Sequence, residues 1–131
     1  MPTATVTVTL QQNADPTKQS SYDFNCAPPQ VTVNKGSVDA TITFNFNQVN
    51  TTGWRFLTVG STGGNTDHFY GVTITNDTTG EFYNPGRTSD SQVQFTDKND
   101  ITTTYTYTVG IDNPGLGLTL GNDPTIDNQG R

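Results

Sequence analysis

The peptide bond best suited to chemistry in this sequence joins Asp123 to Pro124, in the closing stretch "GNDPTIDNQGR". An aspartate carboxyl can attack its own carbonyl carbon, and a proline nitrogen leaves readily once it is protonated. Scission would release only the eight residues "PTIDNQGR", and chain ends tolerate such cuts without unfolding the core. A second pair, Asp15–Pro16, lies between two predicted strands and is expected to form an ordinary turn.

Self-cleavage at Asp123 would require a second acid and an acceptor for the aspartyl group. The acid must protonate the proline nitrogen or steer a water molecule, which calls for a pKa raised by burial or by a like-charged neighbour. No motif selects this acid among the candidates, which are Glu81, Asp97, Asp100 and Asp112. The single histidine, His68, is a further candidate proton carrier, although a lone loop histidine usually has no such role.

The acceptor would be water or a lysine amine whose pKa is depressed by burial. Lys98, in "TDKND", starts the long strand whose hairpin partner leads into Asp123, and its capture of the aspartyl group would form a Lys–Asp isopeptide bond. A strict hairpin register leaves about six residues, roughly 20 Å, between the two. A bulge or a bent edge would be needed to join them. Otherwise Lys98 is a solvated turn cation.

The other residue types narrow the chemistry further. A single cysteine, Cys26, and a single histidine leave too few ligands for zinc, and Cys26 is expected to be a small buried hydrophobe. Asp and Asn crowd "NTD" at 65–67 and "DKND" at 97–100, but neither stretch has the register of a 12-residue calcium loop. We therefore expect no metal and no cofactor.

Composition and charge exclude several classes of protein. The chain has 131 residues, a formal net charge of -6 and only six Lys plus Arg, so a nucleic-acid surface is not expected. No run of about 18 apolar residues predicts a membrane span. The N-terminal "MPTATVTVTL" lacks the features of a secretory signal, which favours a cytoplasmic protein. Oligomeric state cannot be read from these totals.

Apolar residues alternate with threonine or other polar residues through most of the chain, which is typical of strands with one buried face. The clearest examples are residues 3–11, 38–47 and 101–111, and shorter runs lie at 22–26, 31–33, 54–59, 70–74 and 116–120. Eight to ten strands separated by turns predict a single all-β domain over 1–131, an antiparallel immunoglobulin-like sandwich. Residues 60–67 and "NPGR" at 84–87 are expected to be a loop and a turn. Residues 124–131 are expected to be a polar tail that docks through Ile126 as an edge strand.

The stretches "VTVNKGSVDATITFNF", "GWRF" and "DPTIDN", with the length and the all-β pattern, resemble the DP-EP family of small bacterial proteins. The resemblance implies a β-sandwich that cleaves itself at the C-terminal Asp-Pro bond by an acid-assisted, aspartic-peptidase-like mechanism. It also implies a lysine joined to the new aspartyl end. Applied to this sequence, the resemblance implies scission between Asp123 and Pro124, with Lys98 as the amine. The substrate would be the chain's own C-terminal segment, cleaved in a single turnover.

Two other functions remain open. The first is a structural or adhesive sandwich without scission, stabilised by a Lys–Asn or Lys–Asp crosslink. The second is a carbohydrate- or calcium-binding module built on the Asn/Asp/Gly loops. Six aromatic residues could form a sugar platform, but core packing is the stronger expectation for them: Trp54, Phe56, Phe69, Tyr70, Phe82 and Tyr83.

Overall fold

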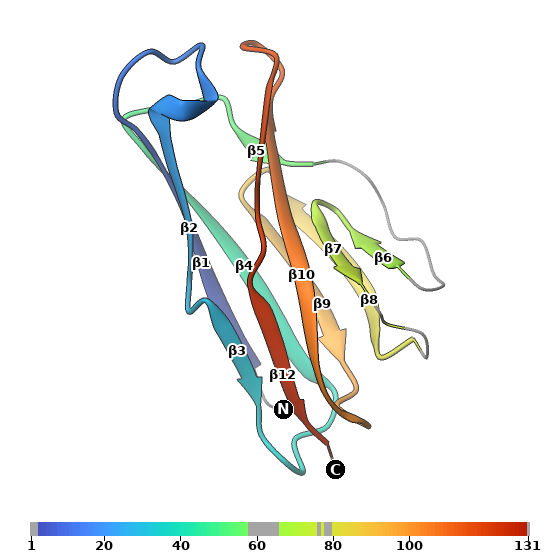
Figure 1. Cartoon of the computed structure of the whole chain (residues 1–131). Helices are drawn as coiled ribbons and strands as arrows, with labels where there is room; N and C mark the ends of the chain where they lie inside the picture. Colours follow the sequence, from blue (N-terminus) through green and yellow to red (C-terminus); the bar gives the residue numbers. More distant parts are fainter. Residues whose placement is uncertain (1–2, 58–65, 76, 78–79, 131) are drawn as a thin grey trace.

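The computed structural model describes residues 3–57, 66–75, 77 and 80–130. Two β-sheets pack face to face, which confirms the predicted all-β sandwich (Figure 1). The helical segment in this part of the chain is a single 3-10 turn, Gln19–Ser21. No helix among these residues is long and apolar enough to cross a membrane.

The first sheet contains five strands in the order β2-β1-β4-β9-β8. Their bounds are Tyr22–Ala27 for β2, Thr3–Gln12 for β1, Ala40–Val49 for β4, Gln92–Asp97 for β9 and Phe82–Ser89 for β8. Strands β1 and β4 run parallel along nearly their whole length. The other pairs of this sheet are antiparallel.

The second sheet has the main order β3-β12-β10-β7-β6, and β11 and β5 also pair with β10. Their bounds are Gln30–Val33 for β3, Thr125–Gln129 for β12, Thr102–Asn113 for β10, Val72–Thr75 for β7, Thr66–Phe69 for β6, Leu118–Asn122 for β11 and Arg55–Phe56 for β5. Strands β3 and β12 run parallel. The sandwich therefore departs from a purely antiparallel one in two strand pairs, β1–β4 and β3–β12.

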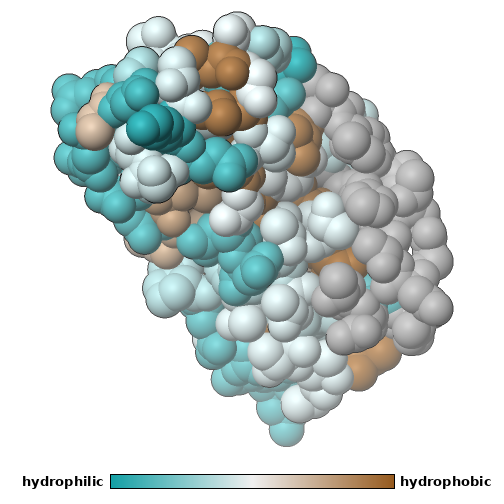
Figure 2. Space-filling view, turned by 45° about the horizontal axis from the view of Figure 1, so that its top comes forward, coloured by the Kyte–Doolittle hydropathy of each residue, from teal (hydrophilic) through white to brown (hydrophobic). Residues whose placement is uncertain are grey.

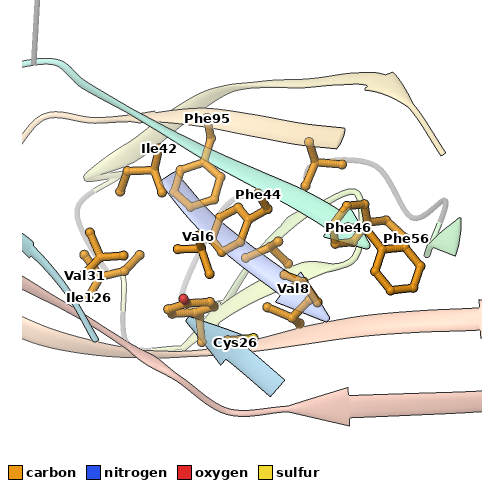
Figure 3. Close-up of a cluster of buried hydrophobic side chains, with 14 of the residues drawn as sticks. Val6, Val8, Cys26, Val31, Ile42, Phe44, Phe46, Phe56, Phe95 and Ile126 are labelled. Carbon is orange, nitrogen blue, oxygen red and sulfur yellow. The ribbon is translucent and has the colours of Figure 1, made fainter. Parts of the chain in front are cut away.

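The core lies between the inner faces of the two sheets. Phe44 of β4 packs against Phe95 of β9 at 5.6 Å and against Tyr107 of β10 at 5.4 Å, between ring centroids. Figure 3 shows Phe44 and Phe95 on one side of this core and Ile126 on the other. Cys26 also lies in the core, as predicted, and its burial raises the pKa of the thiol to about 11.

Two strands begin or end elsewhere than the sequence predicts. Val38 was expected in the long strand at 38–47 but is 37% exposed, because Asp39 takes a left-handed conformation (φ 53°) and β4 begins after it. The expected loop at 60–67 is wrong at its end, where Thr66 already belongs to β6. The rest of that loop, and most of the strand expected at 54–59 beyond β5, lie outside the described residues.

The predicted turn "NPGR" at 84–87 is wrong. These residues belong to β8, whose pairing with β9 shifts register between Tyr83 and Gly86. Because β8 is an edge strand of its sheet, a bulge there can hold Pro85, which has no backbone N–H to donate. The turn itself follows at residues 90–91.

The C-terminal segment is not the edge strand that the sequence suggested. Strand β12 lies inside its sheet, between β3 and β10 (Figure 1). Ile126 and Asn128 are fully buried. The reason is that β3, far away in the sequence, pairs in parallel with β12 and covers its outer edge, a non-local pairing that no local pattern announces.

Candidate functional site

The Asp123–Pro124 junction lies where β11 passes into β12. The Asp123 side chain is exposed, and its Oδ1 accepts a hydrogen bond from the Thr108 hydroxyl at 2.7 Å. Pro124 is buried, and its carbonyl accepts from the backbone N–H of Tyr107 at 3.1 Å. Both residues of the pair are therefore held against β10.

The structure does not bring Lys98 to Asp123. Strand β10 pairs with β11 over residues 109–113 and with β12 over residues 102–106, so Asp123 lies level with Thr108. Lys98 precedes Thr108 by ten residues, which corresponds to roughly 30 Å along an extended chain. The six-residue separation expected from a simple hairpin is wrong, because β11 and β12 continue a single register along β10 that places Asp123 opposite Thr108.

The candidate acids also lie away from the scissile bond. Asp97 contacts Asn128, which lies five residues beyond Asp123 along β12, or about 17 Å. Asp112 forms an ion pair with Arg55 at 3.0 Å. Asp100 is exposed and donates its backbone N–H to Glu81. His68 lies in β6, and its side chain is outside the described part of the structure.

Five buried acidic and amide residues gather in a group that the sequence did not predict. This carboxyl–amide cluster consists of residues at most 1% exposed: Asp77, Glu81, Asp97, Asn99 and Asn128. The cluster lies at the end of the sandwich where β12 finishes, the end that also carries the N and C marks in Figure 1. Of the sequence-predicted acids, the structure unites Glu81 and Asp97 here.

Asp97 occupies the centre of the carboxyl–amide cluster. Its Oδ1 accepts hydrogen bonds from the Asn128 side chain at 2.8 Å and from the backbone N–H of Asn99 at 2.9 Å. Burial, opposed by these two hydrogen bonds and supported by the charges of Glu81 and Asp77, raises the pKa of Asp97 to about 7. Such a carboxyl is largely protonated below neutral pH.

Glu81 and Asp77 bind backbone groups around this centre. Asp77 accepts from the backbone N–H groups of Glu81 and Phe82. The Glu81 carboxylate accepts from the backbone N–H groups of Asp100 and Ile101. Burial raises the pKa of Glu81, although these two hydrogen bonds act in the opposite direction. Glu81 therefore organises the turn between β9 and β10, and Asp77 organises the entry into β8.

Lys98 belongs to that turn but is not directed at a carboxyl of the cluster. Its Nζ lies 5.7 Å from the ring centroid of Tyr83, which is 37% exposed and donates its hydroxyl to Asp39. This contact is a cation–π interaction at the surface. The described surroundings of Lys98 thus match the solvated turn cation, which was the simpler of the two expectations.

A pocket of about 580 Å³ lies at the other end of the sandwich. Four segments meet there: the end of β1, the β1–β2 connection, the segment after β4 and the β10–β11 turn. We call it the end pocket, and its lining consists of Gln12, Pro16, Asn50, Thr51, Thr52, Asn113, Gly115 and Leu116. Figure 2 turns this end toward the viewer, and the coloured surface there is mainly hydrophilic with small hydrophobic areas.

Hydrogen bonds hold the walls of the end pocket in place. Asn113 donates its side-chain amide to the Thr52 carbonyl at 3.1 Å and accepts from the backbone N–H of Leu116 at 3.2 Å. The indole N–H of buried Trp54 donates to the Thr51 hydroxyl at 3.1 Å. These contacts join the β4 end to the β10–β11 turn, so the pocket is formed before any ligand arrives.

Core packing, the stronger expectation for the six aromatic residues, is confirmed for three of them, which are not exposed to a sugar. Trp54, Phe56 and Phe82 are at most 3% exposed and pack in the core, while the Phe69 side chain lies outside the described residues. Nor does any group of three or more His, Cys, Asp or Glu in the described part of the chain have the arrangement of a metal site. In "DKND", Asp97 and Asn99 turn inward to bind backbone and amide groups.

Comparison with known proteins assigns this chain to no family. A scan against models of protein families finds no match, and a search of curated proteins finds no relative. The likeness to the DP-EP family therefore stays a prediction from the sequence stretches that carry it.

Proposed function

We propose that the protein is a non-catalytic binding module whose end pocket takes a neutral, polyhydroxylated ligand such as an oligosaccharide. The observation that carries this proposal is the chemistry of the lining. The eight lining residues offer amides, hydroxyls and two apolar side chains, and none of them is charged. The volume of about 580 Å³ also lies in the range of pockets that hold small molecules.

The hydrogen-bonding groups of the lining suit a sugar. Asn50 and Thr52 form no side-chain hydrogen bond within the described part of the chain, so their amide and hydroxyl remain available to a ligand. An amide and a hydroxyl can each donate and accept, as pairs of neighbouring sugar hydroxyls require. Leu116 and Pro16 supply apolar surface for the C–H faces of a ring, and the net charge of -6 disfavours an anionic ligand.

NMR chemical-shift mapping with a panel of neutral oligosaccharides tests this function. We expect shifts confined to backbone amides around the end pocket, and we expect Asn50→Ala and Thr52→Ala each to weaken binding about fivefold or more, since a lost hydrogen bond is worth about 1 kcal/mol. Asn25→Ala, at an exposed position on β2, is the matched control and should bind as the wild type does. Shifts that map to another surface, or no response to any sugar of the panel, would rule the proposal out.

Self-cleavage at Asp123–Pro124 is the second candidate function. The observation in its favour is the position of β12, which has a partner strand on each side. After scission the eight-residue product would stay docked, so cleavage need not unfold the sandwich. In this proposal the Asp123 carboxyl attacks its own carbonyl to form an anhydride, the protonated proline nitrogen leaves, and water opens the anhydride.

Denaturing mass spectrometry distinguishes the two candidates. Self-cleavage predicts fragments of 123 and 8 residues whose summed mass exceeds that of the intact chain by one water, and native conditions should keep them together. Asp123→Asn removes the attacking carboxylate and should leave the chain whole. Lys98→Ala should be cut as the wild type is, because Lys98 lies far from the bond. A wild-type chain that stays intact during weeks at mildly acidic pH would eliminate self-cleavage and leave the binding proposal untouched.

A further inference from the structure

Two buried oxygen atoms in the carboxyl–amide cluster lack a partner. Asp97 Oδ2 and Asn128 Oδ1 accept no hydrogen bond from the described residues, although both side chains are fully buried. The other halves of the same two groups are joined, because Asn128 Nδ2 donates to Asp97 Oδ1 at 2.8 Å. Buried polar atoms without partners are rare in proteins and costly, so this pair calls for an explanation.

A single proton would satisfy both atoms. A protonated carboxyl gains one O–H donor, and an amide that already donates to one carboxyl oxygen can accept from the other to close a ring of two hydrogen bonds. We propose that Asp97 is a neutral carboxylic acid in the folded protein and donates its proton to Asn128, which makes the pair a pH-sensitive latch on the C-terminal strand.

The charged groups around Asp97 favour the neutral form. Glu81 and Asp77, on the segment leading into β8, would both repel an ionised Asp97. Tyr105 of β10 is a neutral phenol in this range, since burial and these same acids raise its pKa to about 12. The nearest lysine in the sequence, Lys98, is directed at the Tyr83 ring instead. On the β4 side Asp97 is level with Ala40, which carries no charge, and β12 contributes the amide of Asn128. The ion pairs of the described residues, Arg55–Asp112 and Arg87–Asp90, do not include Asp97.

The latch holds more than one strand. Asn99, whose backbone N–H donates to Asp97, donates its side-chain amide to the carbonyls of Asn34, Ser37 and Gly130. Its Oδ1 accepts from the backbone N–H of Gly130 at 3.0 Å. Asp97 thus joins β9 to the β3–β4 turn and to the end of β12. Ionisation of Asp97 would remove one of the two donors of the ring and place a charge in this buried site.

The direction of the pH effect follows from linkage. Because the folded protein holds the Asp97 proton more tightly than the unfolded chain does, the unfolded chain releases it at lower pH. Stability from this group is therefore complete below about pH 4 and is lost as the pH rises to about 7. Above that range Asp97 has no further effect, and the end of β12 should open more often.

Carbon-13 NMR of the Asp97 carboxyl in the full-length protein tests the protonation state without a variant. We expect its Cγ shift to titrate with a midpoint near pH 7. The Gly130 amide should also lose protection from hydrogen exchange across the same range, after correction for the intrinsic exchange rate. A midpoint below about 5, nearer the ordinary value of an aspartate, or unchanged protection at Gly130 would overturn the proposal.

Asp97→Asn provides the second arm of the test. An asparagine can both donate to Asn128 and accept from it, so it mimics the protonated acid at every pH. We expect the melting temperature of the wild type to fall by about 5–10 °C more than that of Asp97→Asn between about pH 4 and pH 7. Asp127→Asn, on β12 beside Asn128 and bonded to Thr104, is the matched control and should keep the wild-type pH dependence. If Asp97→Asn were less stable than the wild type by the same amount at both pH values, Asp97 would act as a charged group throughout, and the latch would be refuted.

Discussion

At the residue scale, glycines set how closely backbones approach in this sandwich. Gly71 has a φ of +97°, and a side chain there would place its Cβ 2.8 Å from both the Gly110 carbonyl oxygen and the Leu57 nitrogen. These backbone atoms cannot move aside, since Gly71 and Gly110 are themselves hydrogen-bonded at 2.6 Å. Gly36 has a similar φ of +84° but open space around it.

A side chain at Gly36 would therefore meet backbone strain alone, whereas one at Gly71 would meet both strain and a steric clash. We expect Gly36→Ala to lower the free energy of unfolding by about 1–2 kcal/mol, the cost of a left-handed conformation for an L-residue. Gly71→Ala should cost at least about 3 kcal/mol because overpacking is added to the same strain. Urea denaturation of both variants measures the difference, and equal losses would contradict the close approach at Gly71.

At the element scale, β12 is the strand whose role differs most from its appearance in the sequence. Its residues are mostly polar, yet Ile126 is fully buried between β3 and β10. We expect Ile126→Ala to lower the free energy of unfolding by about 2–5 kcal/mol, as for other large-to-small core changes. Gln129→Ala, at the exposed end of the same strand, should stay within about 0.5 kcal/mol. Comparable effects of the two changes would argue for a loosely docked tail.

A local sequence pattern predicts a strand well when one face of that strand is apolar and buried and the other is polar. In β1, Val6, Val8 and Leu10 alternate with polar residues and are fully buried, so the period-2 pattern was sufficient. In β8 the irregular part pairs with the neighbouring strand β9, and the turn-like composition of "NPGR" conceals it. The inner position of β12 depends on pairing with a distant segment, β3, which a local pattern does not contain. The same holds for the carboxyl–amide cluster. Asp97 and Glu81 were candidate acids, but the hydrogen bond between Asp97 and Asn128 joins β9 of one sheet to β12 of the other, and turn composition alone does not signal it.

At the scale of the whole molecule, the two ends of the sandwich have different chemistry. The end that holds the chain termini (Figure 1) contains the buried carboxyl–amide cluster, and the opposite end contains the uncharged end pocket. A module attached through its termini would thus present the end pocket away from the attachment point. Because the pocket contains no ionisable side chain, ligand binding should vary little with pH even where the stability of the other end changes.

The net charge of -6 and the buried Asp97 both lower stability as the pH rises, but salt separates their effects. Repulsion among surface charges is screened when the Debye length falls to about 3 Å in 1 M salt, whereas the cost of ionising a buried carboxyl is not. The raised pKa of Asp97, about 7, corresponds to at most about 4 kcal/mol at roughly 1.4 kcal/mol per pH unit.

We therefore expect urea unfolding of the wild type to lose stability between about pH 4 and pH 7 both with and without 1 M NaCl, with a smaller loss in salt. Asp97→Asn should lose less stability than the wild type at both salt concentrations, because only surface repulsion and Glu81, whose pKa burial also raises, then remain as causes. NaCl suits this measurement better than sulfate, which stabilises folded proteins by exclusion from their surface. If salt removes the pH dependence of the wild type, surface charge alone controls the stability of this molecule and the buried acid does not.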